Sequence, residues 1–93
     1  MTTPKIITYD LRPPVQNYDT LISEIKKYST CTGITESTWL IFSEDTCLTI
    51  CNHLTQYIDT NDRIFVAELT GIAAWFNTIC DSDYLKNLLQ ATS

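Results

Sequence analysis

The stretch Ile6-Ile7-Thr8-Tyr9-Asp10-Leu11 decides how the rest of the chain is interpreted. Its β-branched and aromatic side chains suit the pleated, half-buried surface of a sheet. Pro13 and Pro14 follow closely, and proline has no N–H to donate to a strand ladder, so the strand stops there. We therefore expect a short first strand that ends at the carboxylate of Asp10.

Composition predicts a single small globular domain. The chain has 93 residues, of which 44% are hydrophobic, enough for a modest core. The net charge is −5, whereas proteins that hold a phosphate backbone usually carry a basic patch, so the charge disfavours nucleic acid as a partner. No apolar run approaches the roughly 20 residues that cross a bilayer, and the N-terminus lacks the regions of a signal peptide. We expect a cytoplasmic protein with no membrane partner.

The cysteines are expected to be free thiols that pack as small hydrophobic side chains: Cys31, Cys47, Cys51 and Cys80. Cys47 and Cys51 lie one helical turn apart, with His53 close in sequence. A zinc site usually needs four nitrogen or sulfur ligands, so the core interpretation is favoured for the cysteines. His53 is expected at the surface.

Two segments have apolar residues at helical spacing, which predicts helices over about residues 17–29 and 44–58. Asn17 and Ser43 are the expected N-caps of these helices. A short final helix is expected to begin after Asp81 or Ser82. It should bury Tyr84, Leu85, Leu88 and Leu89.

The remaining apolar segments predict strands. Residues 34–42 and 63–69 are apolar on both faces, and residues 72–76 are the expected fourth strand, whereas 30–33 is expected to be a loop. The order predicts an α+β, ferredoxin-like fold of the βαββαβ type, an antiparallel sheet with helices on one face. The second face then needs a cover, which the final helix and a second copy of the chain would supply.

Several segments, quoted in order, carry a family resemblance. They are Tyr9-Asp10-Leu11, Asn17-Tyr18-Asp19-x-Leu21, the run from Glu36 to Ile41, the run from Asn61 to Gly71, and Ala74-Trp75. Over roughly residues 5–76 the chain resembles the small SinR-like proteins. These are similar in turn to CRISPR-associated protein 2 and more distantly to the VapD toxins.

The resemblance implies a ferredoxin-like fold and a homodimer. In the CRISPR proteins an Asp at the end of the first strand, matched here by Asp10, faces the dimer axis. There it can hold a divalent metal ion, Mg²⁺ or Mn²⁺, for phosphodiester cleavage. Those proteins also form the central dimer of the spacer-acquisition complex in antiviral defence, and the VapD toxins are similar ribonucleases. This chain departs from the family's basic character, and only Arg12 lies close to Asp10 in sequence.

Asp10 is the candidate catalytic and metal-binding residue, because paired carboxylates across a two-fold axis offer the oxygen ligands that Mg²⁺ prefers. The alternative is a turn residue that accepts backbone N–H bonds. Glu36 and Glu68 could join Asp10 around a metal, or could be edge charges. Ser37 and Thr38 have no accompanying His–acid arrangement and are interpreted as ordinary strand residues.

The two-faced strands also predict a dimer, because they offer more apolar surface than two short helices can cover. The candidate interface residues are Tyr9, Trp39, Ile41, Val66 and Trp75. Trp39 and Trp75 could stack bases, but without a basic groove a role in the core or interface is favoured.

Two hypotheses for function remain open. The first is a homodimer like CRISPR-associated protein 2, a metal-dependent endonuclease or its inactive relative. The second is a non-enzymatic, acidic protein-interaction module of phage or mobile-element origin. The context of Asp10 favours the first, and the charge balance favours the second.

Overall fold

The structure, a computed structural model, describes residues 2–11, 18–28, 30–70 and 73–90. Its elements are β1 (Thr3–Asp10), α1 (Tyr18–Ile25), β2 (Thr30–Thr35), β3 (Thr38–Ser43), α2 (Cys47–Leu54), the 3₁₀ helix η1 (Thr55–Tyr57), β4 (Arg63–Glu68) and α3 (Ser82–Gln90). The strands form one antiparallel sheet in the order β2-β3-β1-β4. The predicted α+β, ferredoxin-like fold is confirmed.

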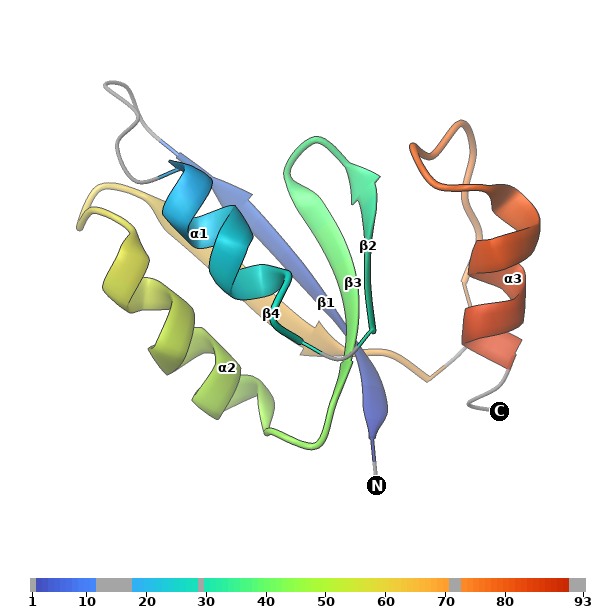
Figure 1. The fold of residues 1–93 in the computed structure, drawn as a ribbon, viewed down its shortest axis with the longest axis horizontal. Coiled ribbons are helices and arrows are strands. Elements are labelled where there is room, and N and C mark those ends of the chain that lie inside the picture. Colours follow the sequence, from blue (N-terminus) through green and yellow to red (C-terminus); the bar gives the residue numbers. More distant parts are fainter. Residues whose placement is uncertain (1, 12–17, 29, 71–72, 91–93) are drawn as a thin grey trace.

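The central strand β1 lies between β3 and β4, and its side chains alternate between the two faces of the sheet. Ile7 lies opposite Trp39 of β3 and Val66 of β4, so these three side chains share one face. Ile6 lies opposite Leu40 and shares the other face with it. Figure 1 shows α1 and α2 on one side of the sheet and α3 on the other.

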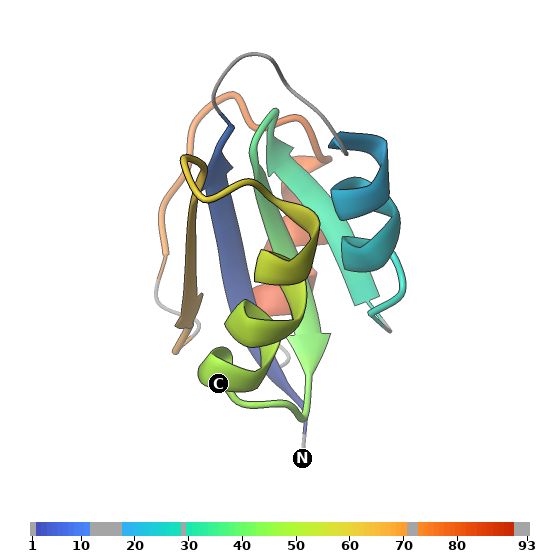
Figure 2. The same ribbon diagram turned by 90° about the vertical axis from the view of Figure 1, so that its left-hand side faces the viewer.

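The main core lies between the sheet and the two-helix layer of α1 and α2. Its buried members come from both layers: Ile7, Tyr9, Ile41, Leu21, Ile25, Ile50 and Leu54. Burial of a large aliphatic side chain contributes about 1.5–3 kcal/mol. The helices therefore dock where the predicted stripes meet the sheet, and Figure 2 shows this layer from the side.

A smaller core lies on the opposite face, under α3. Leu40 of β3 is buried there with Leu85 and Leu89. The final helix therefore supplies part of the cover that the second face needs. Asp81 acts as its N-terminal cap, since its carboxylate accepts the N–H of Tyr84 at 3.1 Å. The predicted burial of Tyr84 is wrong, because this side chain is exposed.

The prediction of a loop at residues 30–33 followed by one strand at 34–42 is wrong. These residues form a hairpin, with β2 and β3 joined at Glu36 and Ser37. Gly33 suggested a break in the chain. In the sheet it lies opposite Trp39, whose ring would lie 4.0 Å from a Cβ at this position. The Trp39 ring covers the glycine, and the strand continues with a shift in register between Gly33 and Thr35.

The predicted fourth strand at residues 72–76 is also wrong: the described residues 73–76 form no strand. The sheet still has four strands, because β2, which was predicted to be a loop, takes the fourth place. Alanine and tryptophan at positions 73–75 instead line a space beneath α3. Apolar side chains suit these positions because they contact this second core. Periodicity alone does not distinguish such a segment from a short buried strand.

Several element ends also differ from the prediction. The β1 strand begins at Thr3 rather than Ile6, and α1 ends at Ile25 rather than near residue 29. The helix predicted over 44–58 begins at Cys47, with Thr46 as its cap, because Ser43 is the last residue of β3. Asn17 and the two prolines lie outside the described residues. The turn expected at 59–62 is confirmed, with the N–H of Asp62 bonded to the carbonyl of Asp59.

Candidate functional site

Asp10 lies at the last position of β1, on the sheet face that α3 covers only in part. It is opposite Arg63, and the residue two places earlier, Thr8, is opposite Phe65. The carboxylate of Asp10 accepts from Nη1 of Arg63 at 3.4 Å. Both side chains are exposed, 61% for Asp10 and 68% for Arg63, so this ion pair is weak and its carboxylate is open to other ligands.

Phe65 is the large apolar side chain of this surface, with 61% of its area exposed. We call the surface formed by Thr8, Asp10, Arg63 and Phe65 the open half of the sheet. A shallow hollow of about 170 Å³ lies against these residues, with Tyr9 and Ile64 at its rim. The open half thus combines a carboxylate, a guanidinium and an exposed aromatic ring.

The other predicted carboxylates, Glu68 and Glu36, lie at opposite ends of the sheet. Glu68 is opposite Lys5, at the far end of β1 from Asp10. Lys5 and Asp10 are five positions apart in β1, about 17 Å, so Glu68 does not reach Asp10 within one chain, and of the two alternatives for Glu68 the edge charge holds. Glu36 lies in the β2–β3 turn, at the same end of the sheet as Asp10, since the N–H of Tyr9 donates to the carbonyl of Ser37 at 3.1 Å. In the part of the chain that the structure describes, no group of three His, Cys, Asp or Glu side chains is placed to hold a metal ion.

The predicted dimer interface needs a correction. Tyr9 and Ile41 are buried beneath α1 and α2, and Trp39 and Val66 pack against the same core. Nε1 of Trp39 donates to the Tyr9 hydroxyl at 3.3 Å, which ties the two rings together inside the protomer. Tyr9 and Ile41 are therefore already covered within the protomer, whereas Trp39 and Val66 are half-buried. The sequence shows that the strands are apolar on both faces but not which face the helices cover.

Trp75, the fifth predicted interface residue, is half-buried beside α3. Its indole Nε1 donates to Oγ of Ser82 at 3.1 Å. Phe65 and Arg63 were not among the predicted site residues. The signal that locates them is the cross-strand register, which pairs residues 53 to 57 positions apart and has no local mark in the sequence.

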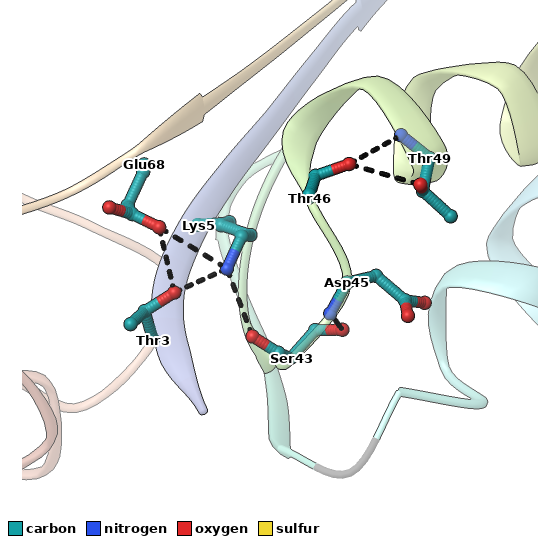
Figure 3. Close-up of polar contacts among 7 residues, drawn as sticks. All are labelled: Thr3, Lys5, Ser43, Asp45, Thr46, Thr49 and Glu68. Carbon is teal, nitrogen blue, oxygen red and sulfur yellow. Dashed lines mark hydrogen bonds and ion pairs between the residues drawn. The ribbon is translucent and has the colours of Figure 1, made fainter. Parts of the chain in front are cut away.

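A second polar cluster surrounds Lys5, whose side chain is only 3% exposed (Figure 3). Its ammonium group donates to the carbonyl of Ser43 at 2.9 Å and to Oγ1 of Thr3, and lies 3.5 Å from a carboxylate oxygen of Glu68. These partners offset the cost of taking the ammonium group out of water. We interpret the cluster as structural, since its hydrogen bonds and ion pair link the ends of β1, β3 and β4.

A third cluster joins the two helices of the main layer. Glu24 of α1 bonds to Nε2 of His53 in α2 at 3.1 Å and accepts from the Lys27 ammonium at 2.6 Å. The Lys27 hydrogen bond lowers the pKa of Glu24 below its ordinary value; partial burial opposes this, and His53 adds to it. The carboxylate therefore stabilises the α1–α2 contact while it is ionised.

We expect Glu24→Gln to lower stability at neutral pH but not in acid. A lowered folded-state pKa gives stability that is fully present above the unfolded-state value, about 4.3, and is lost as the pH falls through the folded-state pKa. Urea unfolding of wild type and variant from neutral to acidic pH should show two curves that converge below about pH 4. A constant difference between the curves at every pH would contradict this origin.

The four cysteines are free thiols, as predicted, and none is fully exposed. The structure places Cys31 against the main core, near Trp39. Among the helices that the structure describes, none has the length and apolar character needed to cross a membrane.

Comparison with models of known protein families, with curated proteins and with solved structures gave no match.

Proposed function

We propose that this chain acts as a homodimer like that of CRISPR-associated protein 2, in which Asp10 binds Mg²⁺ or Mn²⁺ for hydrolysis of a phosphodiester bond in RNA or DNA. The observation that carries the proposal is the position of Asp10. Its carboxylate is exposed at the end of β1, on the open half of the sheet, 3.4 Å from the guanidinium of Arg63.

The open half has the composition of a self-complementary interface. In a two-fold dimer the same patch meets itself, so Asp10 of each protomer can approach Arg63 of the other. Phe65 would pack near the axis, where its exposed ring would leave water. This arrangement also brings two copies of Asp10 toward one another, although each chain supplies a single copy.

The residues of the open half fit a hard divalent ion and a phosphate. Mg²⁺ and Mn²⁺ take carboxylate oxygens and keep several waters, so one Asp10 from each protomer is a suitable donor set. The ion would supply Lewis-acid stabilisation of the phosphate oxygens. Arg63, with its planar set of N–H donors, is placed to hold a phosphate oxygen once the carboxylate binds the metal.

A second candidate function is a non-enzymatic module of phage or mobile-element origin that binds a protein partner. Two observations favour it. The net charge of −5 repels a polyanion. In addition, the Asp10 carboxylate already pairs with Arg63, which could serve only to fix the register of a dimer.

The salt dependence of RNA and DNA binding separates the candidates. A nuclease that holds phosphates should lose affinity steeply between about 50 and 200 mM salt, and its cleavage should stop when EDTA removes the divalent ion. A protein-binding module should show neither effect. Absence of both binding and cleavage with Mg²⁺ or Mn²⁺ would therefore favour the second candidate.

A further inference from the structure

An apolar cavity of about 120 Å³ lies between α3 and the sheet, away from Asp10. Its walls come from the strands, from the residue after β4 and from α3: Ile6, Ile34, Leu40, Leu69, Leu85 and Leu89. Ala73, Ala74 and Trp75 of the connecting segment complete the lining. Among the side chains of this lining the polar group is the indole N–H of Trp75, and Oγ of Ser82 already accepts it at 3.1 Å.

The connecting segment is bonded to β2 and to the start of α3. The N–H of Ile79 donates to the carbonyl of Ile34 in β2 at 3.0 Å. The Trp75–Ser82 bond fixes the segment to the start of α3. Ala73 and Ala74 line the cavity and are also exposed to solvent, so they lie where it opens to the surface. The walls are therefore held in place without closing the cavity.

We propose that this cavity binds one small, uncharged apolar molecule of about the size of benzene. A polar ligand would give up its hydrogen bonds to water and meet a lining that is almost wholly apolar. An apolar ligand restores the dispersion contacts that the lining side chains lack across an empty space. An apolar cavity of roughly 150 Å³ in another protein stays dry and binds benzene or xenon, so the volume suits this class of ligand.

This site is independent of the function proposed for Asp10. Ile6 and Leu69 lie toward the end of the sheet where Lys5 pairs with Glu68, whereas Asp10 pairs with Arg63 at the other end. A ligand in the cavity would stabilise the packing of α3 on the sheet, because Leu85 and Leu89 of α3 would both contact it.

Methyl NMR with benzene as the probe tests this proposal on the full chain. We expect saturable shifts confined to the methyl groups of the cavity, such as those of Ile34, Leu40 and Leu85, with phenol binding more weakly. Ala74→Leu should fill the mouth and weaken benzene binding by about 10-fold or more. Thr20→Leu, which adds the same side chain to the exposed surface of α1, is the matched control and should bind benzene like wild type.

Xenon shifts of the same methyl groups in wild type give a second measurement, which does not depend on how well Ala74→Leu folds. Lack of saturable shifts with both benzene and xenon would overturn the proposal. Equal benzene binding by Ala74→Leu and wild type would also overturn it. Dissociation of a dimer by benzene would overturn the proposal as well, because the cavity would then hold a side chain of a second copy.

Discussion

Asp10→Asn is expected to lower the rate of Mg²⁺- or Mn²⁺-dependent cleavage of RNA or DNA by about 100-fold or more, which corresponds to about 2.7 kcal/mol of transition-state stabilisation. An amide still accepts hydrogen bonds, but it is a far weaker ligand than a carboxylate for a hard cation. Because each protomer contributes one Asp10, the substitution removes both carboxylates at once from a two-fold site. Cleavage of labelled RNA and DNA strands, with and without EDTA, measures the effect.

The substitution should leave the fold intact. Both side chains of the ion pair that it removes are exposed, so the unfolding free energy should fall by about 1 kcal/mol or less. Asp83→Asn in the first turn of α3 is the matched control, since it removes the same charge from an exposed position far along the chain. Cleavage that is equal in wild type and Asp10→Asn would exclude Asp10 as the metal ligand.

Phe65→Glu is expected to weaken the dimer by at least about 100-fold. Burial of an aromatic side chain contributes about 1.5–3 kcal/mol, and a two-fold interface contains two copies of Phe65, so about 3 kcal/mol or more is lost. Each new carboxylate would also lie beside Asp10 of the open half. Sedimentation velocity over a range of concentrations measures the change in dissociation constant.

The matched control for Phe65→Glu is Leu48→Glu, which places the same charge on α2. Leu48 is also largely exposed, but α2 covers the opposite face of the sheet. Leu48→Glu should therefore leave the dimer unchanged. Equal weakening by both variants would mean that added negative charge alone drives dissociation, and an unchanged dimer in Phe65→Glu would move the interface away from the open half.

The sequence predicted the fold class because its signals were periodic. Ile7 and Tyr9 alternate with Ile6 and Thr8, and the helical stripes of α1 and α2 meet the face that carries Ile7. The hairpin of β2 and β3 was missed because Gly33 resembles a break, and only its partner Trp39 shows why a glycine is tolerated there. Cross-strand partners are not visible in a local window of sequence.

The same limit applies to the candidate site. Asp10 could be found because it ends a strand, which is a local feature. Arg63 and Phe65 join it only through the β1–β4 register. Burial of Lys5 was equally hidden, since lysine is rarely buried and nothing near it in sequence marks the Ser43 carbonyl as its partner.

Native mass spectrometry of the wild-type chain with Mn²⁺ tests the central claim most directly, because it reports the number of chains and of metal ions in one particle. A homodimer with Asp10 from each protomer around one ion should appear at twice the 10.6 kDa mass of the chain plus a single Mn²⁺. A particle of one chain across micromolar concentrations, or a dimer whose Mn²⁺ content is the same in Asp10→Asn, would contradict the account.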